Sequence, residues 1–176
     1  MKKICFFSVL IVFLSVNAYA QMSLSLGLGG EVNTYSNGGI AVGYGGLADF
    51  RINEMWSIGF HPMMNIDFGP EAFSVLEVTG NVRWYFLRFK NLLNYYFLWQ
   101  RMFHFFVEFD AGGAFAYLDS DSKLSFNEWV LGGAAGVRIV WEMFYVEPYI
   151  RYAATTQVIG AGVLFGVTIR AKDELR

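Results

Sequence analysis

Ten charged side chains are the residues best able to do chemistry in this sequence. They occur in the same alternating positions as the small residues. Five are acidic and five are arginines, so they could pair, line a narrow polar path, or supply a carboxylate for acid–base catalysis. Equal numbers of opposite charges favour ion pairing, because a buried charge needs a partner or water. The ten are Asp49, Arg51, Glu77, Arg83, Glu108, Asp110, Arg138, Glu147, Arg151 and Arg170.

Catalysis by a nucleophile would need a base beside that nucleophile. The chain has two histidines, His61 and His104, and neither stands in a recognisable serine or acid pattern. We expect His61 to point into the same interior as the charges and His104 to lie at an aromatic rim. Two histidines far apart do not suggest a metal site. The sequence therefore indicates a protein that is not an enzyme and that has no cofactor.

The ten charges stand on one side of a period-two alternation. From Ile40 to Ile52, bulky apolar residues alternate with small residues, Leu47, Asp49 and Arg51. Such alternation places successive side chains on opposite faces of a strand. The pattern recurs along the chain, so we predict about eight strands, long enough to cross a bilayer when tilted. The further stretches lie near residues 22–28, 56–65, 76–86, 105–117, 131–141, 144–152 and 162–170.

Composition favours a membrane protein over a soluble sandwich. The chain is 55% hydrophobic and 16% charged, against about 25% charged residues in soluble domains. A soluble sheet would expose a bulky aromatic face to water, which is an aggregation liability, whereas a sheet in lipid must close on itself. We therefore predict an all-β, closed antiparallel transmembrane barrel. The net charge of −2 and the lack of a basic patch argue against nucleic acid as a partner.

The N-terminus has the layout of a secretory signal peptide. Lys2 and Lys3 precede an apolar run from Ile4 to Val16, and Ala18-Tyr19-Ala20 supplies small residues for cleavage after Ala20. The alternative is an uncleaved anchor. We expect residues 1–20 to be removed and residues 21–176 to form the barrel domain in the bacterial outer membrane.

The predicted connections alternate in length. Short links near residues 53–54 and 142–143 alternate with longer polar links at 31–39, 67–72, 119–127 and 155–157, as in a barrel with short periplasmic turns. The long aromatic segment 88–102 breaks this rule. We expect its flanking strands to extend into an aromatic-rich rim, and the alternative is an amphipathic segment lying in the interface.

The run from Tyr145 to Tyr152 and the glycine-punctuated last strand resemble the small outer-membrane barrel superfamily. That superfamily includes the OmpA transmembrane domain and OmpW-like proteins, and the chain also has a similarity to small barrels of spirochaetes. The resemblance covers the chain after residue 20 as pattern and layout. It implies an assembly signal in the last strand, which Gly162, Phe165 and Val167 fit. Family members often end on a phenylalanine, whereas this chain continues to Arg176.

Two functions remain open at this point, with a lipid-modifying enzyme as a weaker third. The first is a structural or surface-interaction barrel whose lumen is filled by ion pairs. The second is a narrow pore or conduit for small solutes or hydrophobic molecules, favoured by a glycine-rich inner face that includes Leu47 and Leu164. The expected partners are outer-membrane lipid, the assembly machinery, periplasmic chaperones in transit and an unidentified surface ligand at the loops 31–39 and 119–127.

Overall fold

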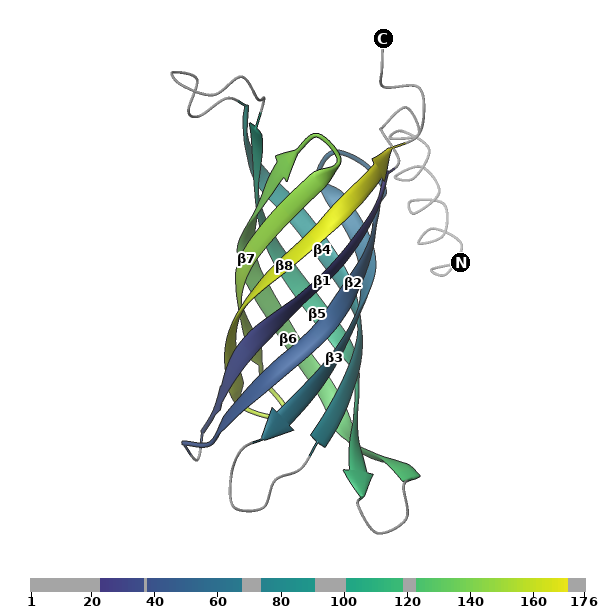
Figure 1. The fold of residues 1–176 in the computed structure, drawn as a ribbon, viewed down its shortest axis with the longest axis vertical. Coiled ribbons are helices and arrows are strands. Elements are labelled where there is room, and N and C mark those ends of the chain that lie inside the picture. The colour runs from purple at the N-terminus through teal and green to yellow at the C-terminus, as the bar shows by residue number, and fades with distance from the viewer. Residues whose placement is uncertain (1–22, 37, 68–73, 91–100, 119–122, 171–176) are drawn as a thin grey trace, which may run out of the picture.

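The computed structural model describes residues 23–36, 38–67, 74–90, 101–118 and 123–170. Eight antiparallel strands pair in chain order, and β8 pairs with β1 to close the barrel (Figure 1). The predicted closed barrel is confirmed, while the signal peptide over residues 1–20 lies outside the described residues. The strands are β1 (Ser23–Tyr35), β2 (Ile40–Arg51), β3 (Trp56–Asp67), β4 (Ser74–Lys90), β5 (Arg101–Leu118), β6 (Lys123–Trp141), β7 (Phe144–Ala153) and β8 (Val158–Arg170).

Side-chain exposure follows the alternation that the sequence predicts. On β1, Leu24, Leu26 and Leu28 face outward, whereas Ser23 and Ser25 are buried inside. The other strands repeat this arrangement, with bulky apolar groups outside and charged residues, small residues and a few large apolar or aromatic residues inside. Within the described ranges, no helix is long and apolar enough to span a membrane.

The strand register fixes the width of the barrel. Stepping from partner to partner round the eight strands, a path that starts at Ser25 on β1 returns to β1 at Tyr35. The shear is therefore ten residues (35 − 25). With about 3.3 Å per residue and about 4.8 Å between strands, this shear tilts the strands by roughly 40°. Eight strands at that tilt leave a bore that side chains can fill.

Two of the polar links predicted as loops are partly strand. β1 continues through Glu31 to Tyr35, and β6 begins at Lys123, so it includes Asn127. The prediction took polar residues as a loop signal, but Glu31 and Asn33 are buried inside the barrel. Asn127 is exposed, and it is strand because β6 extends beyond the barrel wall while paired with β5. The expected extension of the strands around residues 88–102 is confirmed at Lys90 and Met102, which pair on β4 and β5. Residues 91–100 lie outside the described ranges.

Close backbone approach explains one of the inner glycines. A side chain at Gly112 on β5 would collide with the backbone of Val78 and Thr79 on β4, because a Cβ there would meet the Val78 carbonyl oxygen. Gly80, the residue after Thr79 on β4, faces outward, and an added Cβ there would make only ordinary contacts, with the nearest backbone atoms 3.9 Å away. The two positions form a matched pair on adjacent strands.

We expect Gly112→Ala to lower the free energy of unfolding by about 1–3 kcal/mol, because backbone must shift to admit the methyl group. Gly80→Ala should stay within about 0.5 kcal/mol of wild type. Urea unfolding in lipid vesicles, followed by tryptophan fluorescence, measures both. Equal stability of the two variants would contradict the close approach of β4 and β5 at Gly112.

Candidate functional site

The ion pairs inside the barrel form two groups at different levels along its axis. The first lies toward the end of the barrel that carries the start of β1, and we call it the terminus-side cluster. Arg138 reaches Asp49 at 2.8 Å and Glu147 at 2.5 Å. Arg83 reaches Glu147 at 2.7 Å and contacts Glu108 through its Nε. Two guanidiniums therefore tie together three carboxylates from β2, β5 and β7.

The second group, the loop-side cluster, surrounds Arg151 on β7. Arg151 contacts Glu77 at 2.7 Å, Asp110 at 2.8 Å and Glu31 at 3.8 Å. The side chains of Glu31 and Asp110 are fully buried, and those of Arg151 and Glu77 nearly so. One guanidinium thus faces three carboxylates, so this level of the lumen has more negative than positive charge.

Neutral polar groups complete the loop-side cluster. The Asn33 side chain donates to Glu31 at 2.8 Å and to the side-chain oxygen Oδ1 of Asn65 at 2.9 Å, and the Asn65 side chain donates to Glu77 at 3.1 Å. The Tyr149 hydroxyl donates to Glu31 at 2.9 Å. These hydrogen bonds join β1, β3, β4 and β7 and supply the donors that a single arginine cannot.

The sequence reasoning missed Glu31 as a member of the network, because that residue fell in a stretch predicted as a loop. The register offers the signal that would have found it. Glu31 lies an even number of residues from Ser25, so the same alternation that places Ser25 inside also places Glu31 inside. Tyr149 shares the inner face of β7 with Glu147 and Arg151, and its hydrogen bond to Glu31 depends on a strand register that residue spacing does not give.

His104 corrects one expectation. It was predicted at an aromatic rim but is buried in the lumen, where its Nδ1 lies 3.3 Å from an Arg51 nitrogen and its ring meets Tyr85 edge-on. It shares the inner face of β5 with Glu108, four residues along the strand, so the aromatic neighbours of His104 were misleading. Arg51 lies 4.2 Å from the Tyr85 ring centre. Among the described residues, Arg51 therefore packs on an aromatic ring rather than in an ion pair of the two clusters.

The remaining residues singled out from the sequence lie in the lumen, on the outer wall or outside the described residues. His61 is buried in the lumen, as expected, with its ring edge-on to Tyr149. On β8, Gly162 faces inward beside Tyr149, and Phe165 points outward with 60% of its surface exposed. Val167 is half-buried. The side chain of Arg170 lies outside the described residues.

An apolar cluster packs beside the terminus-side ion pairs. Tyr85, Phe106 and Tyr145 are buried in the bore together with Leu47 and Leu164. The Arg138 guanidinium lies 4.5 Å from the centre of the Tyr145 ring, so the aromatic and ionic groups fill the same cross-section. The two leucines that favoured a hydrophobic conduit thus belong to a packed cluster. The arrangement can hold the lumen closed, and each of its carboxylates contacts at least one guanidinium.

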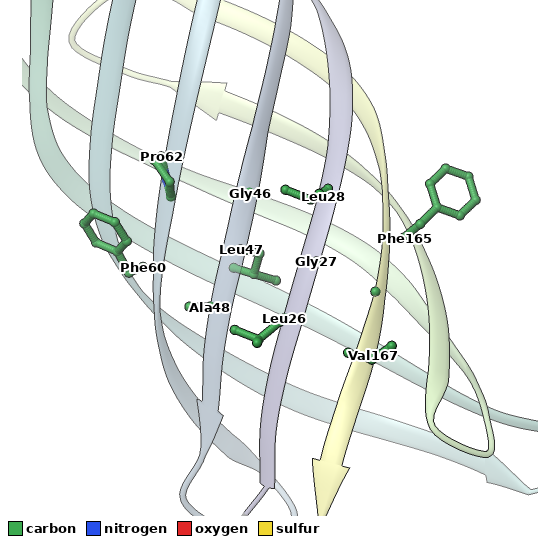
Figure 2. Close-up of a pocket in the computed structure, with 11 residues that line it drawn as sticks. Leu26, Gly27, Leu28, Gly46, Leu47, Ala48, Phe60, Pro62, Phe165 and Val167 are labelled. Carbon is green, nitrogen blue, oxygen red and sulfur yellow. The ribbon is translucent and has the colours of Figure 1, made fainter.

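A groove of about 470 Å³ lies on the outer wall, across β8, β1, β2 and β3. Figure 2 shows Phe60 and Pro62 at one side and Phe165 at the other, with small residues such as Gly46 and Ala48 between. The pairing of β2 with β3 is interrupted opposite Pro62, because proline has no backbone N–H to donate. The groove faces the surroundings of the barrel and is separate from the lumen clusters.

Comparison with known proteins places the fold. No protein-family profile matches the sequence, and no curated protein sequence matches it either. Neisserial surface protein A has a similar solved structure, with a TM-score of 0.52 and 14% identity over 84% of this chain and 96% of that one. The chain therefore has the fold of a small eight-stranded outer-membrane barrel of the OmpA-like type, as the resemblance implied. The similarity to spirochaete barrels stays a prediction.

Two further structures are similar at lower scores. The attachment invasion locus protein Ail of Yersinia pestis has a TM-score of 0.44 and 12% identity, covering 86% of this chain and 99% of that one. The N-terminal barrel domain of Pseudomonas aeruginosa OprF has a TM-score of 0.40 and 11% identity, covering 85% of this chain and 100% of that one.

We expect Arg138→Ala to lower the free energy of unfolding by about 3–5 kcal/mol, because it leaves Asp49 and Glu147 buried without their main partner. Arg88→Ala is the control. Arg88 pairs with Glu54 at 2.7 Å, but 61% of the Glu54 side chain is exposed, so the loss should be at most about 1 kcal/mol. Urea titration in lipid vesicles measures both variants. Equal losses would mean that the lumen network contributes no more than a surface pair.

Proposed function

We propose that this protein is an integral outer-membrane barrel with a closed lumen, which acts by its place in the membrane and by its outer surface. The observation that supports this proposal is the pair of buried ion clusters at two levels of the bore. A solute crossing the barrel would have to separate carboxylates from guanidiniums at both levels. Breaking one buried pair leaves an uncompensated charge and costs several kcal/mol.

The aromatic packing adds a second barrier to passage. Tyr85, Phe106 and Tyr145 fill the cross-section that the terminus-side ion pairs leave open. A path through this level would require these side chains to move together with Arg138, since its guanidinium packs against the Tyr145 ring. The lumen side chains then form the core of the protein, and a partner would bind at the outer end of the barrel.

The route to the membrane and the partners follow from the same proposal. Export uses the signal peptide, which is cleaved after Ala20, and periplasmic chaperones hold the chain in transit. The assembly machinery reads the last strand, where Gly162, Phe165 and Val167 carry the signal. Outer-membrane lipid covers the apolar outer face, and the surface ligand is a molecule other than nucleic acid.

A narrow pore is the alternative, and one observation favours it. In the loop-side cluster, Arg151 faces Glu31, Glu77 and Asp110, so three carboxylates meet one guanidinium. If a path opened through the barrel, this excess of negative charge would favour cations over anions. Ion conduction therefore distinguishes the two functions.

We expect the refolded wild-type chain to give no single-channel steps in a planar bilayer, because both ion clusters close the bore. The triple variant Arg83→Ser/Arg138→Ser/Arg151→Ser, which removes the guanidiniums of both clusters, should conduct. Arg88→Ser is the matched control at an exposed pair and should stay silent. Circular dichroism must show folded β-structure in each sample. Discrete wild-type steps that change when Arg138 alone is neutralised would replace the closed barrel with the pore.

Arginine substitutions on the outer face test whether that face of the barrel contacts lipid. Phe109 lies near the middle of β5 and points outward, with 61% of its surface exposed. We expect Phe109→Arg to lower the free energy of unfolding in vesicles by about 2–4 kcal/mol, because the charge would enter the hydrocarbon. Ile40→Arg, at the outward-facing first residue of β2, should cost about 0–1 kcal/mol. If Phe109→Arg left the free energy of unfolding nearly unchanged, this would argue against contact between lipid and this face of the barrel.

A further inference from the structure

The hairpin of β5 and β6 extends beyond its neighbour β7. The pairing of β6 with β7 begins at Gly132 and Ala153, whereas the pairing of β6 with β5 continues to Lys123 and Leu118. Within the described part of the chain, residues 123–130 therefore have a strand on one side and none on the other. This open edge of β6 is the longest interruption in the described wall of the barrel.

The backbone groups at this edge point away from β5. The Leu131 carbonyl accepts from the Ala154 N–H at 2.7 Å, and the Leu131 N–H donates to the Thr155 hydroxyl at 3.1 Å. Backbone groups of alternate residues in a strand point to the same side, so the N–H and C=O of Trp129 continue this row. In the described ranges, the Trp129 groups are the first of the row that have no strand beside them.

Two features place the edge outside the hydrocarbon. An open sheet edge is not tolerated in lipid, because its backbone groups would have no partners there. The turn after β7 carries Thr155, Thr156 and Gln157, and β6 passes beyond that turn, at the end of the barrel opposite the N-terminus of β1 (Figure 1). The edge is therefore reachable from the exterior.

An aromatic face accompanies the open edge. Trp129 has 70% of its surface exposed and Phe126 has 50%. Their rings meet edge to face at 5.3 Å, and Phe126 meets Phe115 at 5.7 Å. On this stretch the apolar side chains thus form a row beside free backbone donors and acceptors, which is the combination that an added strand uses.

A second copy of the chain cannot fill this edge. Two copies in one membrane are related by an axis along the membrane normal, and each β6 is tilted by roughly 40° from that normal. Facing β6 strands would then cross at roughly 80° and could not run side by side.

We propose that the open edge of β6 binds an extended segment of a partner protein, which adds antiparallel to residues 123–130 as a further strand. This inference rests on the proposed surface role and specifies the kind of partner that the surface binds. The backbone of the segment pairs with Trp129 and its neighbours, and alternate apolar side chains cover Phe126 and Trp129. Glu128 favours a basic residue among the side chains of the segment that point the other way.

The test uses defined peptides and the full barrel in lipid nanodiscs. The probes are fluorescent peptides of about nine residues in which valine alternates with threonine or lysine, each paired with a twin that is N-methylated at alternate residues. Fluorescence anisotropy measures binding. We expect the unmodified peptides to bind and the twins that have lost the pairing N–H groups to bind at least about tenfold more weakly. Absence of binding by every peptide, or equal binding by the twins, overturns the proposal.

Two protein variants separate the backbone from the aromatic face. Trp129→Pro removes the donor at the open edge, and Trp129→Thr keeps the donor but removes the ring. We expect a loss of binding of about tenfold or more for the first and a smaller loss for the second, with heat-dependent electrophoretic mobility confirming that both fold. Wild-type affinity in folded Trp129→Pro would falsify the strand addition. Conductance of the same preparations tests the closed lumen separately, so each failure can be recognised alone.

Discussion

The pairing of backbone groups in hydrocarbon is the constraint on which this structure depends. Lipid offers no hydrogen-bond partner, so a sheet that spans it must close into a ring. With eight strands and a shear of ten residues, closure leaves a bore only as wide as a layer of side chains. That bore has to be filled, so the inner side chains of the strands must match one another in size as well as in polarity. The outer face needs only to be apolar.

The filling of the bore depends on a complementarity between glycine and large polar residues. A Cβ at Gly162 would lie 2.7 Å from the Tyr149 ring, and one at Gly132 would lie 2.6 Å from an Asp110 oxygen. The space that glycine leaves on one strand is thus occupied by a tyrosine or a carboxylate from another. The mixture of glycine and charge along the inner face, which looks inconsistent with a packed interior, is how long side chains fit inside a narrow ring.

Much of this could be predicted from the sequence, because alternation depends only on which residues stand two apart. Residue spacing alone placed Asp49, Arg83 and Glu108 on the inner face. It could not say which carboxylate meets which arginine, since that depends on shear and on bulges between strands. The same alternation would have included Glu31 and His104, but polarity was taken as a loop signal for the first and aromatic neighbours as a rim signal for the second.

The terminus-side cluster draws its members from strands scattered along the chain. Asp49 is on β2, Arg83 on β4, and Arg138 and Glu147 on β6 and β7, with Ser25 of β1 also hydrogen-bonded to Arg138 at 3.2 Å. Two pairs lie within single hairpins, Arg83 with Glu108 in β4–β5 and Arg138 with Glu147 in β6–β7. Asp49 on β2 meets Arg138 on β6 only across the bore, and Arg83 on β4 reaches Glu147 on β7 in the same way. These contacts form when the sheet curls round, so the lumen network stabilises the closed ring over isolated hairpins and links their folding.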